Sequence, residues 1–388
     1  MNDGGGHPPK VWVLAVIIVV MLLVGAWEAI DQGAAGYYAF APGTAPQITG
    51  SVQCQASRGS VELTLPNGQP CARLGVPAGR GHPLQGSLYM VDVLVGPATP
   101  FQYVLSKLGL LHTFDDGVQL VPAKAVLGNT PAGQLPCQDA QQMQGSTSAA
   151  IVVALRHLGY TVKENDLGAQ LTLVAPGSPA AAAGLQCNDV VTTVNTEAVH
   201  TATDLYNAIH AAKPGQTARI TVTRIGPGGK PQTHTFTVRY AGTPAISGQP
   251  ARPGVAFLGV APADQVTYSF PFNVTIDVGD IGGPSAGLAL TLGLLDVLSN
   301  GDLTGGHRVA ATGTINLDGT VGDVGGVAQK TVAVRKAGAQ VFLVPPVELP
   351  VAQREAGSMK VYAVANLQQA LGDLEALGGH LPSQNGAG

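Results

Sequence analysis

The sequence predicts a multidomain protein of the α/β (α+β) class, placed behind one N-terminal transmembrane helix. The chain has 388 residues, which is too long for one average domain. Apolar residues make up 45% of it and charged residues 11%, a balance typical of packed domains. Strand-like runs separated by turn residues fill the first part, whereas strands and helices alternate in the last third.

The N-terminal region contains an uncharged segment, VWVLAVIIVVMLLVGAW, at residues 11–27. Its length is at the lower limit for a helix that spans a bilayer. Lys10 precedes it and acidic residues follow, so we expect residues 1–10 to be a short cytoplasmic tail and the rest to be extracytoplasmic. A cleaved signal peptide is the alternative, with Val24 and Ala26 as its small-residue site. The weak basic start and the long apolar core favour an uncleaved single-pass anchor in the cell membrane, with the lipid bilayer as a partner.

Charge and cysteine spacing exclude two kinds of site. Net charge is −4 at pH 7 and Lys and Arg form no dense cluster, so we expect no nucleic-acid binding. The cysteines show no C-x-x-C spacing, so we expect no metal site.

All cysteines follow the anchor and are disulfide candidates in an oxidising compartment. They are Cys54, Cys71, Cys137 and Cys187. Four cysteines allow three connectivities, and the sequence does not choose among them. The short loop and strand-like flanks favour a bond between Cys54 and Cys71, with free buried thiols as the alternative.

Two regions follow the anchor. Residues 28–145 predict a β-rich extracytoplasmic segment, because short apolar runs alternate with turn residues, as in GSLYMVDVLVG. Residues 146–240 begin with a helix that Ser146 or Ser148 caps and that Gly159 ends.

A compact unit follows that helix, from about residue 168 to residue 224. It predicts a strand, a helical turn, a strand at Val190–Val194, a helix and a further strand. Its pattern PGSPAAAAGL, followed by ND and VN, resembles the PDZ domains of bacterial proteases. The resemblance implies a groove between a strand and a helix, in which a peptide adds as an extra strand. We place the loop that receives the peptide's carboxylate at Leu167, Gly168 and Ala169.

The rest of the chain divides into three parts. Residues 241–253 are rich in proline and glycine and predict a linker. Residues 254–378 form a last domain, with an apolar helix from about residue 286 to residue 298 and a final helix capped by Asn366. Residues 379–388 predict a flexible tail.

Ser285 lies where the motif GGPSAG leads into the apolar helix. The motif fits G-x-S-x-G, the nucleophile turn of α/β-hydrolases, but such an esterase needs a downstream histidine. His307 lies too close along the chain for that topology, and His380 lies in the tail. A base other than histidine is therefore expected.

Lys330 is the candidate base. It lies in the first turn of a helix opened by Gly325 and Gly326, where its stem packs on apolar residues. Burial and the helix N-terminus both disfavour the charged amine, so we expect a lowered pKa. A neutral lysine can take the proton of a serine hydroxyl.

The residues around the serine predict the remaining parts of such a site. Gly282 and Gly283 allow a substrate backbone to come close, and the amide of Ala286 at the helix start can donate to an oxyanion. Taken singly, a serine at a helix start is most often a cap and a lysine is most often solvated. Their combination in one domain favours catalysis.

Two longer motifs, GGPSAGLALTL and ATGTINLDGTVGDVGGVAQKTVAVRKAGAQVFLVP, resemble the proteolytic domain of Lon proteases, peptidase family S16. The resemblance implies that Ser285 is the nucleophile, that Lys330 is the general base, and that Thr312 helps to position the lysine. With the anchor and the PDZ unit, the chain is similar to membrane-anchored, PDZ-containing Lon-like proteins of bacteria. Lon-type domains commonly form hexamers, so the resemblance also implies a homo-oligomeric ring.

The chain departs from ATP-dependent Lon proteases in two ways. Those enzymes usually carry an acidic residue three places before the serine, where this chain has Gly282, with Asp280 nearby. The sequence also lacks a G-x-x-x-x-G-K-[ST] loop, so we expect no ATP and no other cofactor.

The sequence therefore predicts a membrane-anchored, ATP-independent serine endopeptidase that uses a Ser-Lys dyad. Its expected substrates are unfolded or flexible extracytoplasmic polypeptide segments recruited by the PDZ unit. The alternative is a non-enzymatic PDZ scaffold whose Lon-like domain is inactive.

Overall fold

A computed structural model describes most of the chain from Trp27 onward. The described residues are 27–49, 55–56, 63–64, 73–76, 86–111, 117–128, 135–225, 231–245, 250–279, 281–299 and 302–381. Of the predicted transmembrane span, all but Trp27 lies outside them, as do Cys54, Cys71, Asp280 and most of the predicted tail. Within these ranges, no helix combines the length and the apolar character that crossing a bilayer requires.

A five-stranded sheet forms the centre of the C-terminal domain, in the order β2-β6-β18-β21-β22. The last four strands are parallel, and β2 is antiparallel to β6. The strands are β2 (Gln47–Thr49), β6 (Ser87–Tyr89), β18 (Arg308–Ala311), β21 (Val341–Val344) and β22 (Lys360–Ala363). The helices are α8 (Gly287–Leu298), α9 (Val327–Lys336), α10 (Leu349–Glu355) and α11 (Leu367–Ala376), with a short 3-10 turn at Pro346–Glu348.

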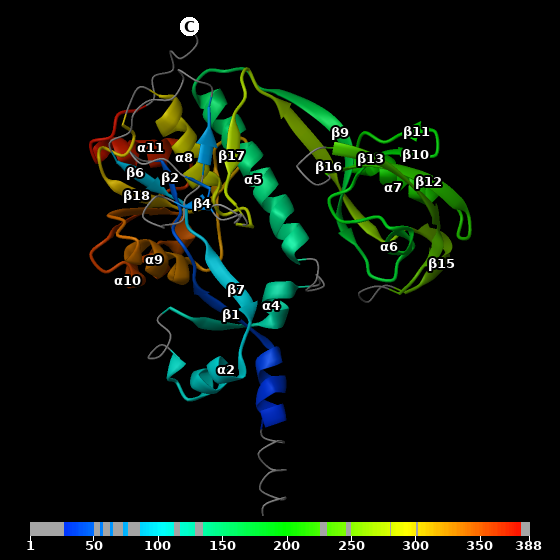
Figure 1. Ribbon diagram of the computed structural model, residues 1–388, viewed down its shortest axis with the longest axis horizontal. Coiled ribbons are helices and arrows are strands. Elements are labelled where there is room, and N and C mark those ends of the chain that lie inside the picture. Colours follow the sequence, from blue (N-terminus) through cyan, green and yellow to red (C-terminus); the bar gives the residue numbers. More distant parts are fainter. Residues whose placement is uncertain are drawn as a thin grey trace, which may run out of the picture.

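Helices cover both faces of this sheet because its strands are apolar on both sides (Figure 1). Val341 and Leu343 pack in one core with α8 and α11, whereas Phe342 and Val344 pack in a second core with α9 and α10. The alternation follows from the two-residue period of a strand. Asn366 caps α11 through its side chain, as predicted.

The N-terminal region does not form a separate segment, contrary to the prediction for residues 28–145. Its strands β2 and β6 complete the sheet of the C-terminal domain. A further sheet in the order β7-β1-β8 extends from this domain, with two short helices. These elements are β1 (Tyr37–Pro42), β7 (Val93–Pro97), β8 (Gln119–Pro122), α2 (Pro100–Lys107) and α4 (Ala123–Leu127). A sequence pattern cannot predict such long-range pairing.

Helix α5 (Leu135–His157) begins eleven residues before Ser146, the first of its two predicted caps, and Ser148 lies inside the helix as well. Ser146 lies in the middle of the helix, and its buried hydroxyl donates to the carbonyl of Pro284 at 3.0 Å. Gly145 does not end the helix, because α5 is held by packing along α8. Gly159, with φ 87°, follows its C-terminal end as predicted.

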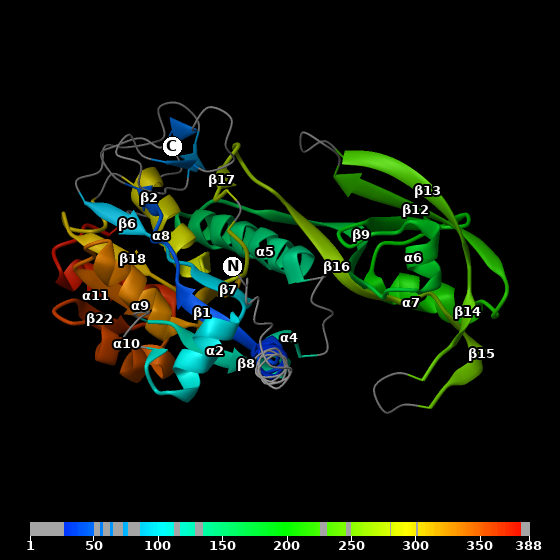
Figure 2. The same cartoon turned by 60° about the horizontal axis from the view of Figure 1, so that its bottom comes forward.

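The PDZ-like domain, residues 163–269, lies beside the C-terminal domain, and α5 runs between them (Figures 1 and 2). Its sheet has the order β13-β12-β10-β9-β16, with β11 paired to β10. The elements are β9 (Lys163–Val174), α6 (Pro179–Ala183), β10 (Val190–Val194), β11 (Glu197–Ala198), α7 (Ala202–Ala211), β12 (Thr217–Ile225), β13 (Pro231–Arg239) and β16 (Val260–Ser269). The strand at Val190–Val194 has the predicted bounds, and Gly184 ends the helical turn in a left-handed conformation.

The region after the PDZ unit also differs from the prediction. β14 (Ala241–Thr243) lies inside the predicted linker and pairs with β15 (Arg252–Phe257), which begins in the linker and continues into the predicted last domain. β16 pairs along its whole length with β9, so it belongs to the PDZ-like domain and not to the last domain. In the part of the sheet that the structure describes, β16 is an edge strand.

The remaining strands form short two-stranded pairs. They are β3 (Gln55–Ala56) with β4 (Leu63–Thr64), β5 (Arg73–Gly75) with β17 (Thr275–Asp277), and β19 (Thr314–Ile315) with β20 (Val321–Gly322).

A disulfide joins Cys137, in the first turn of α5, to Cys187, in the loop before β10, with their Cα atoms 6.4 Å apart. Next to it, Gln141 of α5 donates to the carbonyl of Leu171 in β9 at 3.0 Å. The disulfide is thus a covalent link between α5 and the PDZ-like domain.

Candidate active site

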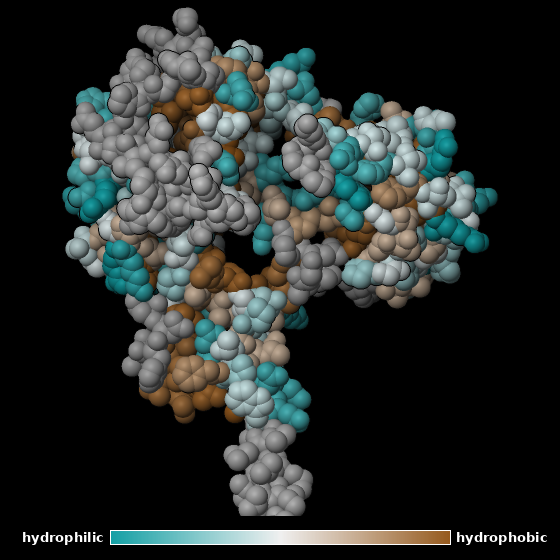
Figure 3. Space-filling view, in the orientation of Figure 1, coloured by the Kyte–Doolittle hydropathy of each residue, from teal (hydrophilic) through white to brown (hydrophobic). Residues whose placement is uncertain are grey.

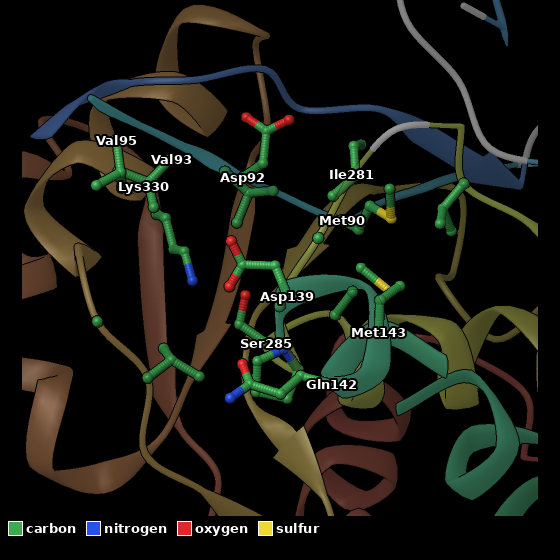
Figure 4. A pocket seen from close by; sticks show the side chains of 18 of the residues that line it. Met90, Asp92, Val93, Val95, Asp139, Gln142, Met143, Ile281, Ser285 and Lys330 are labelled. Carbon is green, nitrogen blue, oxygen red and sulfur yellow. The ribbon is translucent and has the colours of Figure 1, made fainter. Parts of the chain in front are cut away.

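A cleft of about 710 Å³ opens between α5, β7 and the loop that precedes α8 (Figure 4). Side chains from distant parts of the sequence line it. They include Met90, Asp92, Asp139, Met143, Ser285 and Lys330. The cleft is therefore formed jointly by the N-terminal region, α5 and the C-terminal domain.

Ser285 is half-buried, and its hydroxyl points into this cleft (Figure 4). The cap residue of α8 is Ala286, and no side chain caps the helix, so Ser285 does not have the structural role of a helix cap. Its carbonyl accepts hydrogen bonds from the amide of Gly313 at 2.9 Å and from Thr312 Oγ1 at 3.2 Å. Almost all of α8 is buried, so the backbone behind the hydroxyl is firmly held.

Lys330 is the fourth residue of α9, and its side chain enters the same cleft although the residue is only 2% exposed. Burial lowers the pKa of its amine from 10.5 to about 8, while the negative charges of Asp92 and Glu348 act in the opposite direction. The lowered pKa agrees with the prediction from the sequence, with burial as the largest cause. At pH 7, about one amine in ten is then neutral.

Thr312 connects the lysine to the serine backbone. Lys330 Nζ donates to Thr312 Oγ1 at 3.4 Å, and Thr312 Oγ1 donates to the carbonyl of Ser285. Thr312 is fully buried and is fixed by the bond from its own amide to Leu343. Among the described hydrogen bonds, none joins the amine directly to the Ser285 hydroxyl. Ser285, Thr312 and Lys330 therefore lie in one hydrogen-bonded site, in which the lysine amine donates to the threonine hydroxyl.

The predicted contacts for an oxyanion are only partly available. The amide of Gly283 donates to the carbonyl of Asp139 at 2.9 Å, so it is not free for a substrate. A Cβ at Gly282 would lie 2.7 Å from Cβ of Asp139, so this glycine makes room for α5 rather than for a substrate backbone. In the described part of the chain, the amide of Ala286 has no acceptor, and it remains a candidate donor.

Several residues of the cleft were missed by the sequence analysis. Asp92 accepts hydrogen bonds from the amide and, at 2.7 Å, the hydroxyl of Thr44. Asp139 points into the cleft from α5, and burial raises the pKa of its carboxyl (Figure 4). No local motif marks either aspartate, because only the fold brings them to Ser285.

Glu348 is a further buried acid near the site. One of its carboxylate oxygens accepts from the amide of Val324 at 2.9 Å, and the other has no partner among the described residues. Burial raises the pKa of its carboxyl. By contrast, His307 lies in a different pocket, with Arg308 and Arg335, which removes geometric support for the esterase alternative.

The predicted carboxylate loop of the PDZ unit is not where we expected it. Leu167, Gly168 and Ala169 lie inside β9, which has β10 on one side and β16 on the other. In the described sheet β13 and β16 are the two edge strands, and β16 is the one that contacts α7, with Gly259 at φ 84° directly before it.

Two parts of the chain match known families. Residues 157–238 match the PDZ domain, and residues 276–372 match the Lon protease (S16) C-terminal proteolytic domain. The second match contains Ser285, Thr312 and Lys330. The chain thus contains one segment that matches a PDZ domain and one that matches a Lon-type proteolytic domain.

Curated relatives agree with the second match. Lon protease 2 of Bacillus subtilis is 29% identical over 118 residues, which are 30% of this chain and 20% of that protein. Lon protease of Phenylobacterium zucineum is 38% identical over 88 residues, 23% of this chain and 11% of that protein. Lon protease 2 of Thermus thermophilus is 35% identical over 103 residues, 25% of this chain and 12% of that protein. The chain therefore spans a fifth or less of the length of these relatives.

Among solved structures, the PDZ domain of an SdrC-like protein from Listeria monocytogenes is 22% identical to this chain. The match covers 24% of this chain and 86% of that one, with a TM-score of 0.19.

Proposed function

We propose that the protein is a membrane-anchored, ATP-independent serine endopeptidase with Ser285 as nucleophile and Lys330 as general base. The observation that carries this proposal is a buried amine, with its pKa lowered to about 8, in the same cleft as a serine hydroxyl that caps no helix. None of the described residues that line this cleft is a histidine.

The reaction begins with neutral Lys330, whose amine moves from Thr312 Oγ1 to the Ser285 hydroxyl and takes its proton. Catalytic hydrogen bonds of this kind are often long before substrate binds. The serine oxygen attacks the peptide carbonyl, and the amide of Ala286 donates to the resulting oxyanion. The lysine ammonium then gives its proton to the leaving amine, and water releases the acyl group by the same steps.

The proposed substrates are polypeptide segments that are already unfolded or flexible. The sequence contains no nucleotide-binding loop that would mark a motor for unfolding. The unpaired edge of β16 beside α7 supports peptide recruitment, because a substrate tail can add there as a further strand. Cleavage outside the cytoplasmic membrane follows from the predicted orientation of residues 11–27. A hexameric ring stays a prediction from the family resemblance.

A hydrophobic surface on α2 supports a position next to the bilayer. Phe101 in this helix and Leu108 directly after its end are 67% and 63% exposed, and Leu110 is exposed as well. Figure 3 shows hydrophobic surface in this part of the molecule. The helix packs against the start of the described chain, because a Cβ at Gly33 would lie 2.7 Å from the ring of Tyr103. Trp27, at the end of the apolar run, is also exposed. Exposed apolar and aromatic side chains of this kind suit a membrane interface.

Digestion of casein without ATP, by the full chain in detergent or vesicles, tests the peptidase proposal. We expect cleavage by the wild type and none by Ser285→Ala or Lys330→Met, with His307→Ala as an active control. Cleavage that survives both substitutions would rule out the dyad.

The second candidate function is a PDZ scaffold without catalysis. The missing direct bond between Lys330 and the Ser285 hydroxyl favours it. It predicts that tail peptides bind but that no condition yields cleavage, and a peptide-binding assay beside the casein digestion separates the two.

A further inference from the structure

Two carboxylates of the cleft, those of Asp323 and Asp139, have no hydrogen-bond or ion-pair partner among the described residues, and Asp139 is the one that α5 holds next to the loop of the serine. In Figure 4 it points into the space above Ser285, with Lys330 on the other side. Asp92 differs, because its carboxylate accepts two hydrogen bonds from Thr44. Lys330 differs too, since it is buried and donates to Thr312.

The backbone that carries Asp139 is fixed on two sides. Two residues before it, Cys137 is bonded to Cys187 of the PDZ-like domain. Its own carbonyl accepts from the amide of Gly283, two residues before the nucleophile. The backbone at Asp139 therefore has a defined position relative to Ser285, which limits where the carboxylate can meet a substrate.

The walls next to the carboxylate are apolar. Met90, Met143 and Ile281 line the same cleft (Figure 4). A lysine or arginine side chain combines an aliphatic stem with a cationic head, so it can pack on such walls while its head reaches a carboxylate. An acidic side chain would instead meet the like charge of Asp139.

We propose that Asp139 is a specificity-determining residue that binds the cationic side chain of a lysine or arginine close to the scissile bond. This assignment rests on the proposed peptidase function. Arginine is the better ligand of the two, because its planar guanidinium can bind both carboxylate oxygens. The substrates of the enzyme are then segments with a basic residue next to the cut.

The test uses fluorogenic peptides with acetylated N-termini and the full chain in detergent. One position at a time, from three residues before to three residues after the cut, carries Arg, Leu or Glu. We expect kcat/KM for Arg to exceed that for Leu by roughly tenfold at one position, and the ratio to decrease with salt. In Asp139→Asn the Arg-to-Leu ratio falls to about one, and in Asp139→Lys the Glu peptide becomes better than the Arg peptide.

Glu375→Gln is the matched control, because it removes one negative charge from an exposed residue of α11 outside the cleft. It should keep the wild-type ratio. A ratio near one in the wild type, or a preference for Arg that persists in Asp139→Asn, would overturn the assignment while leaving the peptidase function intact. A preference that requires a free α-amino group would also overturn it, since the cation would then be the peptide's N-terminus. No cleavage of any peptide would reject the peptidase function and this assignment together.

Discussion

The two proposed peptide-binding regions of this protein depend on different parts of the polypeptide. In the C-terminal domain, function depends on side chains that the core holds in place, such as Lys330, which is 2% exposed. In the PDZ-like domain, it depends on the backbone of β16, whose outer edge is unpaired in the described structure. A single side-chain change should therefore abolish the first function, whereas the second should respond mainly to the end and length of the peptide.

The largest expected effect is that of Lys330→Met. We expect kcat/KM to fall by at least about 1000-fold, the usual cost of losing a catalytic base. The same change should raise the free energy of unfolding at pH 7 by roughly 1–3 kcal/mol, because methionine removes a buried charge whose pKa is lowered to about 8. Peptide cleavage and urea denaturation measure the two effects. A variant that is inactive because it is less stable would contradict this account.

Activity and stability should both depend on pH through Lys330 of the C-terminal domain. The neutral amine is the base, so kcat/KM should rise about tenfold between pH 7 and pH 9, with a midpoint near 8. Stability should rise with pH from about 8 to 10.5, because over that range the unfolded lysine binds more protons than the folded one. A pH profile of initial rates, with unfolding followed over the same range, checks both signs. A midpoint near 6.5 would point to a histidine instead.

Peptide binding by the PDZ-like domain should be tested by changing the substrate rather than the enzyme, with KM as the measured quantity. A flexible substrate with an apolar C-terminal tail should have a KM about tenfold lower than the same substrate with an amidated C-terminus, while kcat stays similar. Short peptides that do not reach β16 should show no such difference. Initial-rate measurements on the paired substrates test this, and equal KM values would remove the PDZ groove from the mechanism.

The smallest expected effect on catalysis is that of removing the disulfide between α5 and the PDZ-like domain. Replacing both Cys137 and Cys187 by serine should lower kcat/KM by a factor of about 2 to 5, because the first turn of α5 holds Gly283. It should also lower the free energy of unfolding by about 2–4 kcal/mol. Wild type treated with a reducing agent should behave like the double variant, and full activity after verified reduction would show that α5 needs no such support.

Local signals predicted much of this structure. The strand at Val190–Val194, the cap at Asn366 and the glycines 159 and 184 each follow from a few neighbouring residues. Long-range pairing was not predictable: β6 joins β18 from more than two hundred residues away, and β16 joins β9 across the whole PDZ unit. Asp139 was missed for the same reason, since only tertiary contacts bring α5 to Gly283.

The path of the chain between the two domains bears on the products of cleavage. The polypeptide enters the PDZ-like domain after α5 and leaves it through β16, and the disulfide adds a third covalent connection. Three connections leave little freedom for one domain to turn against the other. A tail seated on β16 would then reach Ser285 after a set number of residues, so different substrates should release C-terminal fragments of nearly uniform length.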